Sequence, residues 1–242
     1  MKKIVPLSVI FVFCALVLPA QESNQDPGIS FNGFVKNDAF FDTRQNVTAR
    51  EGHFLLWPKP ESPDVNQQDL NASGNFNILA IQSRISGTIS GLEALGAKTS
   101  GKIEGDFFAQ ASDNINLFRL RHAFVKLSWE NTQLLAGQYW NPMFVTSCFP
   151  GTVSFNTGVP IQPFARNPQI RLTQYFGDMK FMAAILSQRD YPSRMDDIVS
   201  SRFLRNSGTP DMHLQVHYDK ARFNAGIGMA YKTIVPRLVT EQ

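Results

Sequence analysis

The sequence predicts an all-β protein, an antiparallel up-and-down transmembrane β-barrel of which about nine strands are present. Three observations predict this fold. Long segments alternate apolar and polar residues with a period of two, which is how a strand places side chains on opposite faces. Tight and long connections alternate between these segments. An apolar segment at the N-terminus has the features of an export signal.

The first residues have the layout of a secretory signal peptide. A basic head precedes an apolar run from Ile4 to Pro19, and Ala20 stands before a polar stretch. A membrane-spanning helix needs about 20 apolar residues, so this run is short for the alternative, a transmembrane anchor. We therefore expect a signal peptide at 1–20, a short linker at 21–28 and the N-terminal portion of a barrel domain at 29–242.

Composition excludes several classes of protein. The 242 residues include 23 Lys and Arg and 20 Asp and Glu, for a net charge of +3. Lys2 and Lys3 lie in the signal, so the remaining chain is nearly neutral and gives no argument for nucleic acid as a partner. Removal of the signal also leaves Cys148 as a single cysteine, which excludes an internal disulfide.

Nine segments alternate clearly enough to predict strands. In the first, Ile29, Phe31 and Val35 share one face, and Lys36 and Asp38 share the other. The expected strands are 29–42, 76–90, 98–110, 117–129, 133–140, 169–176, 179–189, 212–218 and 222–232. The phase of the fourth slips near Lys126, which predicts a β-bulge there.

The connections favour a membrane barrel over a soluble sheet. Short connections are expected at 91–97, 130–132, 177–178 and 219–221, and long ones at 44–75, 142–168 and 190–211. Short turns at one end and long loops at the other are typical of outer-membrane barrels. Nine is an odd number, whereas single-chain bacterial barrels have even numbers of strands. We therefore expect a barrel left open by truncation.

The polar face of these strands predicts a water-filled lumen, because charged groups are rarely buried without partners. The predicted pore-lining residues are Lys36, Asp38, Arg84, Lys102, Glu104, Asp106, Arg119, Arg121 and Arg171. A row of arginines favours anions, since a guanidinium can hold a carboxylate or phosphate through two hydrogen bonds. Charge balance with the three acidic residues is the alternative role for the arginines, and an antiparallel sheet with one face in bulk solvent is the alternative fold.

The connection at 142–168 predicts a constriction of the lumen. It is rich in Pro and Phe and is too long and apolar for a freely solvated loop. The predicted constriction residues are Phe144, Phe149, Phe164 and Arg166. A lid or a subunit contact is the alternative role for this segment.

The sequence offers no catalytic or metal-binding motif. His213 and His217 lie on one face of an expected strand, about 13 Å apart and therefore too far apart to share a metal ion. Glu104 and Asp106 also share a face, but Lys102 and the arginines beside them favour ion pairs over acid–base catalysis. We therefore expect no enzyme activity, no cofactor and no metal site.

Several segments carry a resemblance to a known family. They are Phe31-Asn32-Gly33-Phe34-Val35-Lys36-Asn37-Asp38, Asp42-Thr43-Arg44-Gln45, Arg50-Glu51-Gly52, Gly101-Lys102-Ile103-Glu104-Gly105-Asp106-Phe107-Phe108, Arg119-Leu120-Arg121-His122-Ala123-Phe124 and Leu134-Leu135-Ala136-Gly137-Gln138-Tyr139-Trp140. In their order and spacing they resemble the DcaP-like outer-membrane porins of Bacteroidetes-type bacteria. The resemblance covers roughly residues 28–239. The N-terminal coiled-coil segment of some family members has no counterpart in this sequence.

The resemblance implies a homotrimer of barrels with about sixteen strands each, which pass small, often anionic solutes. It implies pore-wall positions for Lys102, Arg119 and Arg121. It also implies that Gln138-Tyr139-Trp140 is the end of the strand before the constricting loop. We therefore expect a porin in the outer membrane, with membrane lipid and anionic solutes as partners. The alternatives are a secreted soluble β-sandwich that binds a ligand and an outer-membrane hydrolase, for which no Ser, His and carboxylate set can be assembled.

Overall fold

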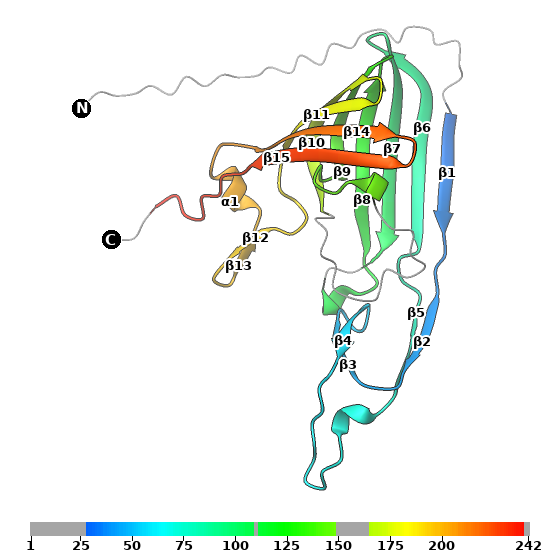
Figure 1. The fold of residues 1–242 in the computed structure, drawn as a ribbon, viewed down its shortest axis with the longest axis vertical. Coiled ribbons are helices and arrows are strands. Elements are labelled where there is room, and N and C mark those ends of the chain that lie inside the picture. The colour runs from blue at the N-terminus through cyan, green and yellow to red at the C-terminus, as the bar shows by residue number, and fades with distance from the viewer. Residues whose placement is uncertain (1–27, 109–110, 149–164, 240–242) are drawn as a thin grey trace, which may run out of the picture.

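The fold is a single curved wall of antiparallel strands (Figure 1). The structure, a computed structural model, describes residues 28–108, 111–148 and 165–239, so the predicted signal peptide lies outside the described residues. The sheet has nine strands in the order β1-β6-β7-β8-β9-β10-β11-β14-β15. Their bounds are β1 Gly28–Phe34, β6 Arg84–Ala94, β7 Ala97–Phe107, β8 Phe118–Ser128, β9 Thr132–Trp140, β10 Arg166–Phe176, β11 Met179–Leu186, β14 Asp211–Lys220 and β15 Phe223–Tyr231. The prediction of an all-β antiparallel fold is confirmed.

The remaining elements lie in the connections. Three two-stranded sheets pair β2 (Asp38–Asp42) with β5 (Asn75–Leu79), β3 (Asn46–Ala49) with β4 (Phe54–Pro58), and β12 (Ser193–Met195) with β13 (Ile198–Ser200). The short helices are η1 (Leu70–Ala72), η2 (Ser112–Asn114), η3 (Thr146–Cys148) and α1 (Arg202–Arg205). In the described part of the chain, no helix has the length and apolar character needed to cross a membrane.

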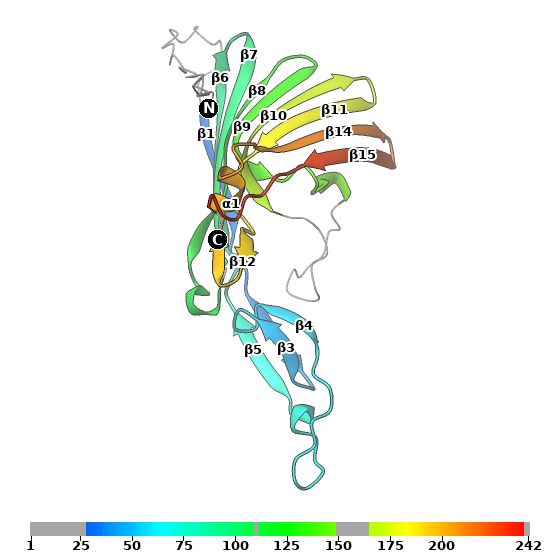
Figure 2. The ribbon, with the colours of Figure 1, turned by 90° about the vertical axis from the view of Figure 1, so that its left-hand side faces the viewer.

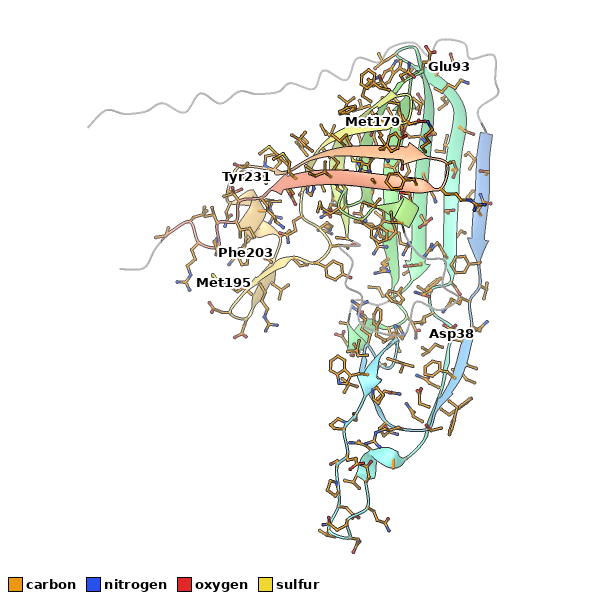
Figure 3. All side chains as sticks on the ribbon, viewed as in Figure 1. Asp38, Glu93, Met179, Met195, Phe203 and Tyr231 are labelled. Atoms are coloured by element: carbon orange, nitrogen blue, oxygen red, sulfur yellow. The ribbon has the colours of Figure 1, made fainter. Side chains whose placement is uncertain are left out.

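The two ends of the sheet carry different kinds of connection. The turns at 95–96, 129–131, 177–178 and 221–222 join the strands at one end of the sheet, and the segments 35–83, 108–117, 141–165 and 187–210 join the strands at the other end (Figure 2). Figure 3 labels Glu93 and Met179 toward the short-turn end and Asp38 at the opposite end. The left-handed Leu95 and Gly96, with φ of 54° and 70°, suit a tight hairpin turn. The predicted separation of short and long connections is therefore confirmed.

The expected first strand, 29–42, is wrong as a single element. β1 ends at Phe34, and β2 pairs with β5 in a separate ribbon. The break has a physical cause, because Gln82 adopts a left-handed φ of 66° and its N–H donates to the Phe107 carbonyl oxygen. The ribbon and the β3–β4 hairpin form an extension, here called the arm (residues 35–83), which projects beyond the sheet (Figures 1 and 2).

The predicted bulge near Lys126 is also wrong in position. The register of β7 and β8 shifts between Glu104, which is opposite His122, and Gly105, which is opposite Leu120. Arg121 is therefore the extra residue of the bulge, and Arg121 and His122 are both buried. Two consecutive side chains of β8 are thus buried, whereas strict alternation would bury only one of them.

The two faces of the sheet differ in chemistry. Large apolar side chains are exposed on one face, including Phe31, Ile85, Ile103, Leu172, Phe181, Leu214, Ile227 and Met229. The other face buries polar side chains, including Ser86, Glu104, Asp106, Gln169, Thr173, His213, Gln215 and His217. This inversion of the usual pattern, with polar groups covered and large apolar groups uncovered, is unlike a sheet in a water-soluble protein.

Candidate pore-wall site

Three neighbouring strands bring the predicted charged residues together. In the ladder of β6, β7 and β8, Asp106 stands opposite Arg84 on one side and Arg119 on the other. Directly opposed residues have Cβ atoms about 5 Å apart, so their side chains can meet. Lys102 and Glu104 precede Asp106 on the same face of β7 at a spacing of two residues. The register of the sheet therefore builds the cluster.

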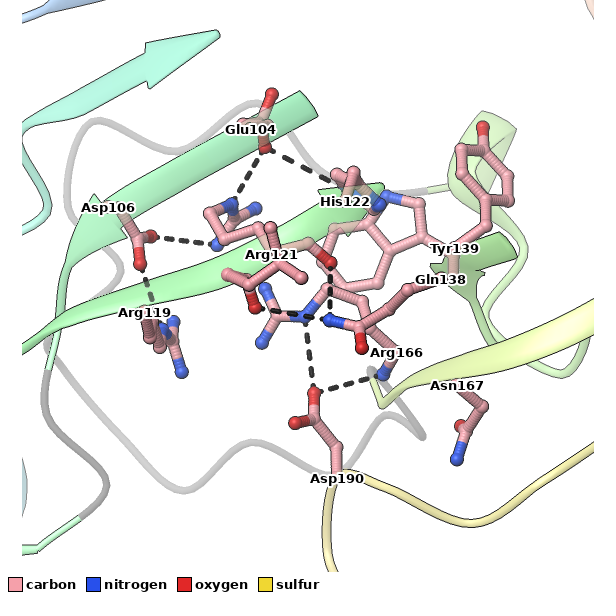
Figure 4. A network of polar contacts seen from close by, with 12 residues as sticks. Glu104, Asp106, Arg119, Arg121, His122, Gln138, Tyr139, Arg166, Asn167 and Asp190 are labelled. Carbon is pink, nitrogen blue, oxygen red and sulfur yellow. Dashed lines mark hydrogen bonds and ion pairs between the residues drawn. The ribbon is translucent and has the colours of Figure 1, made fainter. Parts of the chain in front are cut away.

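Asp106 is the most buried acid of this cluster, with 1% of its residue surface exposed. Arg119 Nε donates to its Oδ1 at 2.8 Å, and Arg121 Nη1 donates to its Oδ2 at 2.9 Å (Figure 4). Arg84 Nη2 lies 3.6 Å from the same Oδ2. One carboxylate thus holds three guanidinium groups.

Glu104 holds the second half of the cluster. Its Oε1 accepts from Arg121 Nε at 2.8 Å, and its Oε2 lies 2.8 Å from Lys102 Nζ. Arg84 Nε approaches Oε1 at 3.8 Å. Arg121 therefore bridges the two carboxylates (Figure 4). Two carboxylates, those of Glu104 and Asp106, thus form ion pairs with four cations. The cluster therefore has more positive than negative charge.

A second group of side chains extends from the first toward β10. Arg166 Nε lies 3.2 Å from Asp190 Oδ2, and the Arg166 backbone N–H also donates to Asp190 (Figure 4). The guanidinium groups of Arg166 and Arg121 lie 5.0 and 5.6 Å from the centre of the Trp140 ring. His122 packs against the same ring at 5.2 Å. The indole thus receives two cations, an arrangement that stabilises both electrostatically.

The structure corrects the expected position of Arg166 in the loop. Arg166 is the first residue of β10 and pairs with Trp140 in the ladder. Phe144 does lie in the connection and packs against Trp140, with ring centres 4.6 Å apart. Phe149 and Phe164 lie outside the described residues, so their predicted roles stay predictions.

Arg171 lies on the polar face farther along β10. Its Nε donates to Gln169 Oε1 at 2.9 Å, and its guanidinium lies 5.1 Å from the Tyr139 ring centre. Among the described residues no carboxylate forms an ion pair with Arg171. Its charge therefore adds to the positive excess of the wall.

Two of the predicted residues lie apart from this wall. Lys36 forms an ion pair with Asp38 at the base of the arm. Asp38 begins β2, which belongs to a different sheet from the nine-stranded wall. The alternation at 29–42 put both on a continuous polar face, and the break after β1 removes that continuity.

A cavity of about 690 Å³ opens at the long-connection end of the cluster. It is lined by four arginines and one carboxylate, from the arm, β8, β10 and the β11–β14 connection: Arg50, Arg119, Arg166, Arg189 and Asp190. Sequence reasoning missed Arg50 and Arg189. Arg50 lies in a connection, where periodicity gives no orientation, and Arg189 was expected at the end of the strand 179–189, which in the structure ends at Leu186.

The described residues give no support to a metal site. No group of three or more potential metal ligands among His, Cys, Asp and Glu occurs in them. His213 Nε2 lies 2.9 Å from Asp211, and His217 Nε2 lies 2.9 Å from Gln215 Oε1. The two histidines thus have separate partners.

These features describe an open antiparallel wall with one apolar face, one polar face and its short turns at one end, which is the arrangement typical of the strands of a β-barrel. The wall is similar to the crystal structure of the outer membrane channel DcaP of Acinetobacter baumannii, with a TM-score of 0.61 and 20% identity. The match covers 89% of this chain and 56% of that chain. The likeness confirms the predicted resemblance at the level of the fold.

Comparisons by sequence give no further relative. No family model matches the chain, and no curated protein matches it. The chain spans just over half the length of the channel whose fold it shares.

Proposed function

We propose that this chain forms wall strands of an outer-membrane porin that passes small hydrophilic solutes by passive diffusion and prefers anions. The observation that carries the proposal is the opposite chemistry of the two faces of one sheet. Ile103 and Ile227 are uncovered on the outer face, whereas the neighbouring inner face carries the arginine cluster. An outer face of this kind fits lipid, and an inner face of this kind fits water and solutes.

The preference for anions rests on spare positive charge. Four cations share Glu104 and Asp106, and Arg171 adds another charge without an acid. Each guanidinium has five N–H donors, and the contacts of Arg119 with Asp106 engage only its Nε. Donors remain for a passing carboxylate or phosphate.

We also propose the constriction and the cellular setting. Phe144 and Arg166 meet at Trp140 on the polar face, which supports a narrowing of the lumen at this level. The proposal includes export by residues 1–20 with removal of that segment, residence in the outer membrane, and assembly as a homotrimer. No nucleic acid, cofactor or chemical step belongs to it.

Conductance of the full-length protein in planar lipid bilayers tests this function. We expect stepwise currents, and a reversal potential in a KCl gradient that indicates anion preference. Arg119→Gln and Arg171→Gln should each lower the ratio of anion to cation permeability, about 2-fold or more. Lys220→Gln is the matched control, because Lys220 is an exposed cation beside a short turn.

The outcomes separate the parts of the proposal. An absence of current steps from folded, membrane-inserted protein would refute the channel. Current steps with cation preference would keep the channel and refute the role of the arginines. Folded monomeric protein in buffer without detergent would instead favour the soluble β-sandwich.

A further inference from the structure

The arm contacts the end of the sheet through a small apolar core that contains a histidine. Phe108, which follows β7, is 2% exposed and packs with Phe54, Leu79 and Ile81. The His53 ring stacks on Phe108, with ring centres 5.7 Å apart, and His53 has no exposed surface. An ionisable ring thus lies in the contact between the arm and the sheet.

The surroundings of His53 favour its neutral form. Among the residues that the structure describes, neither ring nitrogen has a hydrogen-bond partner, and both nitrogens are buried. The guanidinium groups of Arg50 and Arg119 lie 5.6 and 4.6 Å, respectively, from the centre of the Phe108 ring. Burial, followed by the charge of Arg50, lowers the pKa of His53, and Glu51 acts in the opposite direction.

Acidic groups around this junction act chiefly on the arginine rather than on the histidine. Burial lowers the pKa of Arg50, and Arg119 acts in the same direction, whereas Tyr191 and Asp190, in the β11–β14 connection, act in the opposite direction. Among these neighbours only Glu51 stabilises a charged His53. Protonation of His53 therefore puts a poorly compensated cation into an apolar contact that already has Arg50 beside it.

The turn that carries His53 is held in an unfavourable conformation. Arg50, Glu51 and Gly52 have successive left-handed φ values of 54°, 53° and 82°. Residues other than glycine rarely adopt this conformation. A Cβ on Gly52 would lie 2.8 Å from Asn77 Nδ2, so the turn is also packed closely against the arm. This turn closes the β3–β4 hairpin, and so it holds His53 in a fixed place at the contact between the arm and the sheet.

We propose that His53 is an acid-sensitive latch, which holds the arm against the sheet when neutral and releases it when protonated. The closed state lowers the proton affinity of His53. Opening returns its pKa to the ordinary value for histidine, about 6.5. The closed state is therefore fully favoured above that pH. As the pH falls below it, the ratio of open to closed arm rises by up to about tenfold per pH unit.

Release has a consequence for the arginine-lined cavity. Arg50 lines this cavity together with Arg119 and Arg166. Because Arg50 belongs to the arm, an open latch removes one cation from the cavity and uncovers Phe108. Acid would thus alter the long-connection end of the wall. The latch itself does not depend on conduction, so it can hold or fail independently of the proposed channel.

Distance measurements between two spin labels test the latch on the full-length protein in lipid nanodiscs. One label replaces Val65, which is 96% exposed in the arm, and the other replaces Glu93 at the short-turn end, in a Cys148→Ser background. Between about pH 7.5 and pH 5 we expect a second distance population that grows up to about tenfold per pH unit.

Two variants and one control decide the result. His53→Phe keeps the ring stack but cannot be protonated, and His53→Gln keeps a polar group without a charge. Neither variant should show a second population that grows as the pH falls, whereas His217→Gln, changed in the wall, should retain this growth. The absence of a second population in the wild type would overturn the latch. An equal pH response in either folded His53 variant would overturn it as well.

Discussion

Asp106 is the residue on which the ionic cluster depends most. Asp106→Asn removes a buried charge that Arg84, Arg119 and Arg121 share, and so leaves the three cations to repel one another. We expect the free energy of unfolding to fall by about 3 kcal/mol. Urea denaturation in detergent micelles, followed by tryptophan fluorescence, measures this change.

The control for this prediction is an exposed ion pair of similar chemistry. Asp178→Asn breaks a contact with Lys220, and both side chains are about half exposed. Screening by solvent limits the expected loss to less than about 1 kcal/mol. Equal losses in the two variants would contradict a special role for the buried cluster.

The chemistry of single residues was only partly predictable. Glu104, Asp106 and Arg119 could be placed on one face because a period of two is sufficient for that. The position of His122 could not be predicted, because it depends on the bulge at Arg121, which the pairing with β7 creates. A local pattern along one strand does not contain the register with its neighbour.

Gly137 illustrates, at the scale of the element, what fixes the pairing of β8 and β9. Its φ is +131°, and a Cβ there would lie 2.2 Å from the Ala123 carbonyl oxygen. Gly137→Ala should force the two strands apart and lower the free energy of unfolding by about 3 kcal/mol. Thermal unfolding monitored by circular dichroism measures the loss.

A turn glycine provides the comparison for Gly137. Gly177 also has a left-handed φ, of 56°, but a Cβ there would meet nothing within 4 Å. Gly177→Ala should therefore cost only the backbone strain, about 1 kcal/mol. If the two variants lost the same stability, close approach of the backbones would not be the reason for glycine at position 137.

The elements of the wall were more predictable than those of its connections. Eight of the expected strands, from 76–90 onward, correspond to β6–β11, β14 and β15, with ends that differ by a few residues or, at 76–90, include β5. Alternation is a property of each strand and so appears in the sequence. The arm was not predicted, because the alternation of β1 continues into β2, and the break between β5 and β6 is marked by the left-handed φ of Gln82, which the alternation does not reveal.

At the scale of the whole molecule, the sheet can be a membrane wall only if its uncovered apolar face meets lipid. Ile103 lies in the middle of β7, 63% exposed, and stands opposite Gly87 and Ala123. These small neighbours leave space for a longer side chain. Ile103→Arg therefore tests whether lipid or water surrounds this face, because it does not disturb the packing.

In a membrane wall, Ile103→Arg should lower the free energy of unfolding in lipid bilayers by about 2–4 kcal/mol, because the guanidinium must lie in the hydrocarbon. In a water-soluble sheet the same exposed change would stay within about 0.5 kcal/mol. Val65→Arg, at the exposed end of the arm, should be neutral in both cases. Reversible unfolding of the full-length protein from liposomes measures both variants. A neutral Ile103→Arg would show that this face meets water, and the barrel wall would then be the wrong description of the sheet.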